Sequence, residues 1–125
     1  MNHNGVISLP LSTSFAGRAG DAVGIGTGAK AGQLIAGTVA NAIGVLLHDV
    51  DQSASDLPGA VHLFNSGGIF NVKCLGATAI GAAHNLGAGG LASTAGSAAL
   101  GTKRFIPLEV GAANGVIRAI LISNS

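Results

Sequence analysis

Glycine interrupts this sequence so often that few stretches are long enough to form a stable helix. The chain has 125 residues, of which 21 are glycine, and they recur at short intervals from Gly17 onward. Glycine weakens both helices and strands and favours tight turns. Many short apolar segments separated by glycine-rich turns are typical of β architecture. The sequence therefore predicts an all-β fold, a small compact barrel or sandwich.

Short apolar runs mark the expected strands. The candidates are Val6–Leu11, Ala22–Ile25, Leu34–Ile35, Ala42–His48, Ala60–Phe64, Ile69–Leu75, Leu91–Thr94, Phe105–Val110 and Val116–Ile122. The stretch from Val39 to Val50 also admits a short helix followed by a strand. The loop Asn65–Gly68 predicts a hairpin between the strands on either side of it. In the second of these strands Phe70, Val72 and Cys74 share one face, so lone Cys74 is expected to be buried.

Asn114-Gly115 predicts a hairpin at the C-terminus, because both central residues of the preferred two-residue turn need positive φ. That turn would place Leu108 opposite Leu121. Both faces of the hairpin are rich in apolar residues, so both are expected to be buried. For a small domain, another subunit most simply covers the second face. We therefore expect Phe105, Ile120 and Ile122 to contact a neighbouring subunit.

Residues 1–16 differ from the rest, with a polar start, then Pro10 and a run of hydroxyl residues. They predict an extended N-terminal arm, followed by a single β domain over residues 17–125. The start of the chain has no basic segment typical of a signal peptide, and no window is apolar enough for a membrane span.

Charged residues make up only 9% of the chain, whereas a usual soluble domain is about one quarter charged. A surface so poor in charge indicates extensive burial between subunits or partners. The six basic residues are scattered, and only Lys103 and Arg104 are adjacent, so a nucleic-acid partner is not expected. Lone Cys74 excludes an internal disulfide and fits a reducing cytosol.

Two motifs could indicate an enzyme or a metal site. Residues Gly24–Ala29 match a dinucleotide-binding fingerprint, with Asp49 near the position of a ribose-binding acid. The competing interpretation is a turn between short strands, because chance matches are common in so glycine-rich a chain. His48, Asp49 and Asp51 are possible metal ligands, which His62 and His84 could join, but their spacing matches no known pattern. We expect no enzymatic activity and no cofactor.

The order of these features resembles the small capsid decoration (head-stabilising or cement) proteins of tailed bacteriophages. The resemblance covers about residues 17–124. It rests on Ala19–Val23, Ile43–Asp49, Gly67–Val72, Gly89–Leu91, Pro107–Glu109 and Val116–Leu121. The stretch Gly87–Gly101 is longer than the family pattern, which leaves the register of the following strands open.

The resemblance implies a non-catalytic homotrimer on the outer capsid surface, made in the host cytoplasm. It would bind between major capsid protein subunits after the head expands. In that setting the N-terminal arm would contact the capsid through Val6, Ile7, Leu9 and Leu11. The alternatives are a small nucleotide-binding enzyme or subunit using Gly24–Ala29, and a tail or fibre component.

Overall fold

The computed structural model describes residues 5–38, 41–87, 89–95 and 103–124. The predicted all-β fold is confirmed, since the helical segments in this part of the chain are two three-residue 3-10 turns, η1 (Gly28–Lys30) and η2 (Phe64–Ser66). The strands are β1 (Val6–Leu9), β2 (Ala16–Gly17), β3 (Ala22–Ile25), β4 (Leu34–Ala36), β5 (Ala42–Leu46), β6 (Val50–Asp51), β7 (Gly59–Leu63), β8 (Ile69–Lys73), β9 (His84–Leu86), β10 (Leu91–Ala95), β11 (Lys103–Pro107) and β12 (Val116–Asn124).

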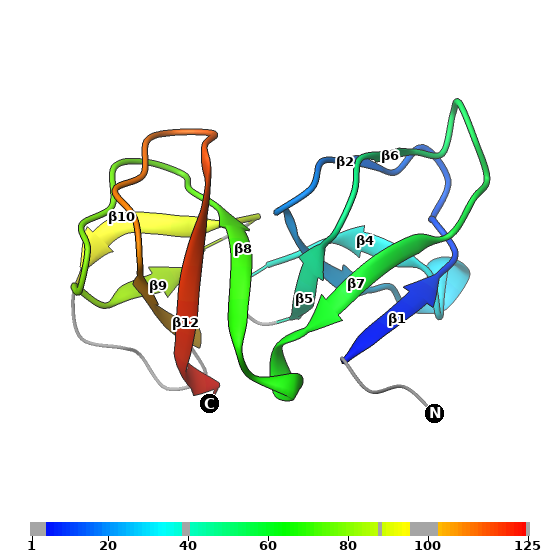
Figure 1. The fold of residues 1–125 in the computed structure, drawn as a ribbon. Coiled ribbons are helices and arrows are strands. Elements are labelled where there is room, and N and C mark those ends of the chain that lie inside the picture. The colour runs from blue at the N-terminus through cyan, green and yellow to red at the C-terminus, as the bar shows by residue number, and fades with distance from the viewer. Residues whose placement is uncertain (1–4, 39–40, 88, 96–102, 125) are drawn as a thin grey trace.

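The strands form two lobes that lie side by side (Figure 1). The N-terminal lobe, residues 6–63, contains a five-stranded sheet in the order β1-β7-β5-β3-β4 and the small pair β2-β6. The C-terminal lobe, residues 69–124, contains a five-stranded sheet in the order β10-β9-β11-β12-β8. Neighbouring strands in each sheet are antiparallel. Each sheet is therefore built from one continuous half of the chain.

Each sheet curls until its two edges nearly meet. In the N-terminal lobe Leu11, just beyond β1, forms a parallel bridge with Leu34 of β4, and Leu34 N donates to Pro10 O at 2.8 Å. In the C-terminal lobe Cys74, just beyond β8, forms the same bridge with Leu91 of β10. There Leu75 N donates to Leu91 O at 2.8 Å. Both lobes thus close in the same way, through the end of their first strand.

The two lobes have the same topology throughout. Taken in chain order, β1, β3, β4, β5 and β7 correspond to β8, β9, β10, β11 and β12, and the spatial order of each set is identical. The pair β2-β6 has its counterpart in the bridge between Thr78 and Gly111, which joins the same two connections. The chain is therefore a tandem structural repeat.

The registers of the two lobes agree at the positions that define the alignment, although β-bulges interrupt the pairs β3-β5, β9-β10 and β11-β12. His62 of β7 is flanked by Val6 and Val45, and Ile120 of β12 is flanked by Ile69 and Ile106. Followed through β5 and β3, this alignment makes Leu34 equivalent to Leu91. The closing bridges give the same result, because Leu11 and Cys74 are equivalent and bridge to Leu34 and Leu91 respectively. The strand pairings and the closing bridges thus give the same alignment independently, so equivalent positions can be compared between the lobes.

Two apolar clusters fill the molecule. One lies inside the N-terminal lobe and includes Leu11, Phe15, Leu34 and Val61. The other fills the C-terminal lobe and extends to Val45 and Phe64 of the N-terminal half. The rings of Phe64, Phe70 and Phe105 meet edge-on, with centroids 5.5 to 6.0 Å apart. The second cluster is what joins the lobes.

The predicted division into an arm and a domain is wrong for residues 5–16. β1 pairs with β7 along its whole length, and Leu11 and Phe15 are buried in the N-terminal cluster. The reason is the alternation of Ile7 and Leu9, which lets one side of an extended strand bury its apolar side chains. Residues 1–4 lie outside the described part of the chain.

The predicted hairpin around Asn65–Gly68 is absent, whereas the predicted C-terminal hairpin forms with another register and a longer loop. β7 and β8 follow one another but enter different sheets, because η2 and the positive φ values of Gly67 and Gly68 redirect the chain. At the C-terminus Phe105, rather than Leu108, lies opposite Leu121. The connection of residues 108–115 is longer than a two-residue turn because it bonds to other segments: Asn114 N donates to Cys74 O, and Gly111 N donates to Thr78 Oγ1.

Candidate interaction surfaces

An apolar face covers the outside of the C-terminal lobe. Ile106, Ile120 and Ile69 stand in register on the adjacent strands β11, β12 and β8. Register partners project from the same side of a sheet, so the three side chains form one row. Ile69 is 52% exposed, Ile120 40% and Ile122 47%. We call this surface the isoleucine face, consisting of Ile69, Ile106, Val116, Ile120 and Ile122.

An exposed ion pair interrupts the isoleucine face, because Arg118 projects from β12 on the same side as Val116 and Ile120. Arg118 Nε donates to Glu109 Oε2 at 3.0 Å, and the backbone N of Arg118 donates to the same oxygen at 2.8 Å. These two hydrogen bonds lower the pKa of the Glu109 carboxyl from its ordinary value. Both side chains are open to water, so the pair adds little to stability. It separates Val116 from the apolar row formed by Ile69, Ile106 and Ile120.

A mainly apolar cavity of about 430 Å³ opens on the N-terminal lobe. Its lining includes Ile7 of β1, Ile25 of β3 and Leu63 of β7. Phe64, Asn65 and Lys103 close the side toward the C-terminal lobe. Ile25 is 40% exposed there although its neighbours on β3 are buried. Within the described part of the chain, the cavity is thus an unfilled apolar opening.

The predicted contact residues do not behave alike. Ile120 and Ile122 are exposed on the isoleucine face, as a subunit contact requires. Phe105 is fully buried inside its own lobe, so its prediction as a subunit contact is wrong: on β11 it projects inward, opposite to Ile106. The other predicted contact residues, Val6, Ile7, Leu9 and Leu11, belong to the N-terminal lobe.

The four residues predicted to contact a capsid lie on or just beyond β1. Leu11 is buried, and Ile7 and Leu9 pack partly against the N-terminal cluster. Val6 is half-buried. β1 is nevertheless an edge strand of its sheet, so its backbone, more than these side chains, is available to a partner.

Ile25, Ile69 and Ile106 were not predicted as contact residues. For Ile69 the signal was its alternation with Asn71 and Lys73, which places all three on one side of the strand.

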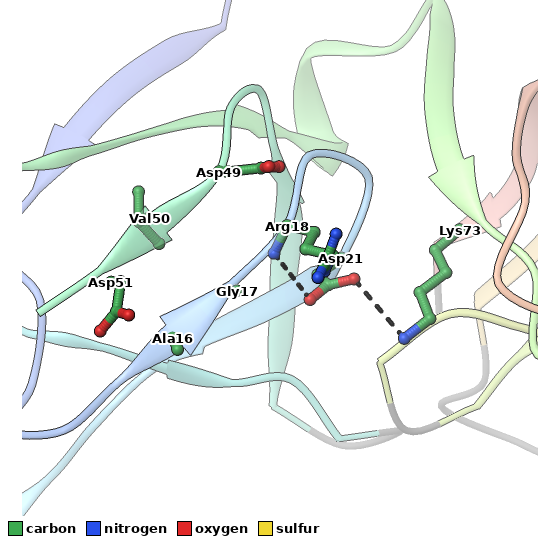
Figure 2. Close-up of a pocket in the computed structure, with 8 residues that line it drawn as sticks. All are labelled: Ala16, Gly17, Arg18, Asp21, Asp49, Val50, Asp51 and Lys73. Carbon is green, nitrogen blue, oxygen red and sulfur yellow. Dashed lines mark hydrogen bonds and ion pairs between the residues drawn. The ribbon is translucent and has the colours of Figure 1, made fainter. Parts of the chain in front are cut away.

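A polar groove of about 370 Å³ runs between the lobes, and Figure 2 shows Asp21 lying between Arg18 and Lys73. Asp21 Oδ2 accepts from the backbone N of Arg18 at 3.0 Å, and Oδ1 lies 3.8 Å from Lys73 Nζ. Backbone pairing reinforces this contact, since Lys73 N donates to Gly20 O at 2.9 Å. The ion pair between Asp21 and Lys73 and the backbone hydrogen bond from Lys73 to Gly20 therefore link the two lobes at this groove.

The structure corrects the interpretation of Gly24–Ala29 as a dinucleotide site. Gly24 lies within β3, and the helix that follows is the three-residue η1. A dinucleotide fingerprint requires a long helix that starts on the loop and points its N-terminus at the phosphates. Asp49, the expected ribose-binding acid, instead accepts a hydrogen bond from Ala19 N at 2.9 Å. The segment is the strand and turn of the competing interpretation.

The other chemistry-bearing residues have structural partners. His48 Nε2 accepts from Ala60 N at 3.0 Å, and the buried His84 bonds to Ala79 and Ala92 through its two ring nitrogens. Burial raises the pKa of the Cys74 thiol. In the described part of the chain no three His, Cys, Asp or Glu side chains gather closely enough to hold a metal ion.

His62 makes the stability of the lobe contact depend on pH. Its ring stacks on Phe70 of the other lobe, with centroids 4.1 Å apart, and burial lowers its pKa from the usual 6.5. As the pH falls below about 6.5, His62 binds a proton more readily in the unfolded chain than in the folded chain. The free energy of unfolding therefore decreases as the pH falls from about 6.5. We expect a lower denaturation midpoint at pH 5 than at pH 7.5. His62→Phe keeps the stack and should show a smaller decrease; an unchanged decrease would exclude His62 as its source.

Within the described residues, no helix is long and apolar enough to span a membrane. A comparison with protein families found no family model that matches the sequence, and a search of curated proteins found no match either.

Proposed function

We propose that this chain is a structural protein of a virion, a capsid decoration protein that binds between major capsid protein subunits and stabilises the expanded phage head. The proposal includes self-association as a homotrimer on the outer capsid surface. Its starting point is the ordered set of sequence segments that resembles this family, and the all-β fold agrees with that resemblance. The protein would act by contact alone, without a cofactor or nucleic acid.

The isoleucine face is the observation that carries the proposal. Its large aliphatic side chains lie on three adjacent strands, and all but the half-buried Ile106 are exposed. The chain has only eleven charged residues among 125. Monomeric soluble proteins seldom expose large apolar patches, and those that do commonly use them as interfaces. A protein that acts by binding to a capsid needs exposed apolar surfaces and no catalytic site.

The edge strand β1 supplies a second support. A partner strand can add to an exposed sheet edge through backbone hydrogen bonds, with little demand on side-chain chemistry. We assign capsid contact to the free edge of β1, Val6–Leu9, and no longer to the buried side chain of Leu11. Three such edges in a trimer would act multivalently, so that individually weak contacts give firm attachment.

Binding to expanded and unexpanded capsids tests this proposal. The purified protein is mixed with both forms of a capsid from the phage that encodes it, and the bound fraction is measured by co-sedimentation. We expect saturable binding to expanded capsids and greater resistance of the decorated shells to heat. The matched variant Ser8→Pro, on the exposed side of β1, should weaken binding because proline removes an edge donor. Equal binding to both capsid forms, or to neither, would refute the proposal.

A further inference from the structure

The tandem repeat shows how one lobe covers the other. On the N-terminal lobe, Val45 and His62 stand side by side on the outer surface of β5 and β7. Val45 is completely buried in the cluster shared by both lobes, and the His62 ring stacks on Phe70. Next to them Phe64 enters the C-terminal lobe and meets Phe70 and Phe105 edge-on. This outer surface of the N-terminal lobe is therefore the surface that contacts the C-terminal lobe.

Among the residues that the structure describes, no other lobe covers the same surface of the C-terminal lobe. By the register of the repeat, Ile106 and Ile120 are the equivalents of Val45 and His62. Counted along the chain, Ile122, two residues beyond Ile120, matches Phe64, two residues beyond His62. Ile122 lies at a bulge of β12, and Phe64 begins η2. Phe64 is 2% exposed whereas Ile122 is 47% exposed. The isoleucine face is thus the uncovered counterpart of the surface that joins the two lobes.

The receiving side has an uncovered counterpart as well. In the C-terminal lobe, Phe70 and Leu86 belong to the cluster that receives Phe64. Their equivalents in the N-terminal lobe are Ile7 and Ile25, which line the apolar cavity of about 430 Å³. Leu86 is 1% exposed, whereas Ile25 is 40% exposed. Each chain therefore carries one open donor face and one open receiving cavity, and these match a contact already made inside the chain.

We infer that a second copy of this chain occupies the isoleucine face. The C-terminal lobe of one copy binds the N-terminal lobe of the next, with Ile122 entering the cavity beside Ile7 and Ile25. The contact repeats between chains the arrangement that Phe64 makes between lobes. Because donor and receiver are different surfaces, the association is head-to-tail, and it ends when the ring closes. The head-to-tail contact follows from the tandem repeat, and only the number of subunits in the ring, three, rests on the proposed function.

Two single variants separate the donor from the receiver. Ile122→Asp places a charge on the donor face and Ile25→Asp places one in the cavity, and both positions are already partly open to water. Each variant should weaken self-association at least about tenfold and sediment as a monomer, because removing a charge from water into an apolar contact is strongly unfavourable. Val110→Asp, at a 73% exposed site in the loop between β11 and β12, should leave the ring intact.

Mixing the two variants tests the head-to-tail geometry. The Ile122→Asp chain keeps its cavity and the Ile25→Asp chain keeps its donor face, so an equimolar mixture should form a one-to-one heterodimer by sedimentation velocity. A face that pairs with itself would instead leave Ile25→Asp fully associated, which would overturn the inference. A wild-type chain that is monomeric at high micromolar concentration would overturn it as well.

Capsid binding is measured separately from ring formation, so the two proposals can fail independently. All ring measurements use the protein alone, and circular dichroism establishes that each variant retains the wild-type fold. A variant that has lost the fold is replaced by Ile120→Ser or Ile25→Ser, which must also dissociate the ring if the inference is correct. A ring that binds no capsid would refute the decoration function and leave the inference standing.

Discussion

Replacing Phe64 with alanine is expected to lower the free energy of unfolding by about 4 kcal/mol. The ring is buried where the lobes meet, and it contacts Phe70 and Phe105 edge-on. Alanine would leave a cavity in the only cluster that spans both halves of the described chain. A stable domain has about 5–15 kcal/mol in total, so the loss would be a large part of it.

Denaturant unfolding followed by far-ultraviolet circular dichroism measures this loss, since the chain has no tryptophan or tyrosine to report by fluorescence. Protein concentration is held constant because self-association adds to apparent stability. The control is Phe64→Leu, which keeps most of the volume and should cost about 1.5 kcal/mol. Equal losses for the two variants would contradict the role of Phe64 as the joint between lobes.

The second large effect is expected at Gly44, in the middle of β5. A Cβ atom at this position would overlap the carbonyl oxygen of His62 and come within 2.8 Å of Val61 Cγ1. The carbonyl belongs to the neighbouring strand β7 and cannot move without breaking the sheet. Gly44→Val should therefore destabilise the protein by about 3 kcal/mol, as overpacking in a rigid core does.

Gly32 provides the matched control for Gly44. An added Cβ at Gly32 meets nothing within 4 Å, and only its φ of +74° opposes a side chain. Gly32→Ala should cost about 1 kcal/mol for that backbone conformation. The comparison separates the general cost of losing a glycine from the specific overlap in β5. A Gly44→Val variant as stable as Gly32→Ala would show that the two strands can separate to admit the side chain.

Local patterns predicted the strands, because alternation and turn residues act over a few positions. β3, β5 and β8 were expected close to where they lie, and Phe70, Val72 and Cys74 share the buried face that was expected of them. β9 was missed because His84-Asn85-Leu86 has little of the apolar character that marks a strand. It forms because His84 is buried and bonded at both ring nitrogens.

Strand pairing was harder to predict, because it depends on contacts between distant residues. The segments around Asn65–Gly68 look like a hairpin locally, but β8 pairs with β12 instead of β7. The repeat was also hidden, since equivalent positions differ in size and chemistry. Gly44 and Phe105, for example, occupy the same place in the two lobes. Of the candidate surfaces, Ile120 and Ile122 were expected, and the cavity beside Ile25 required the three-dimensional structure.

The division of strands between two continuous halves of the chain has a consequence for synthesis on the ribosome. Every strand of the first sheet has been made once Leu63 is added, so that lobe can fold while the rest is still being translated. At ordinary elongation rates residues 64–125 take on the order of ten seconds. During that interval Val45 and His62 face water. The nascent protein is then most exposed to aggregation, and a chaperone that binds it would do so at this stage.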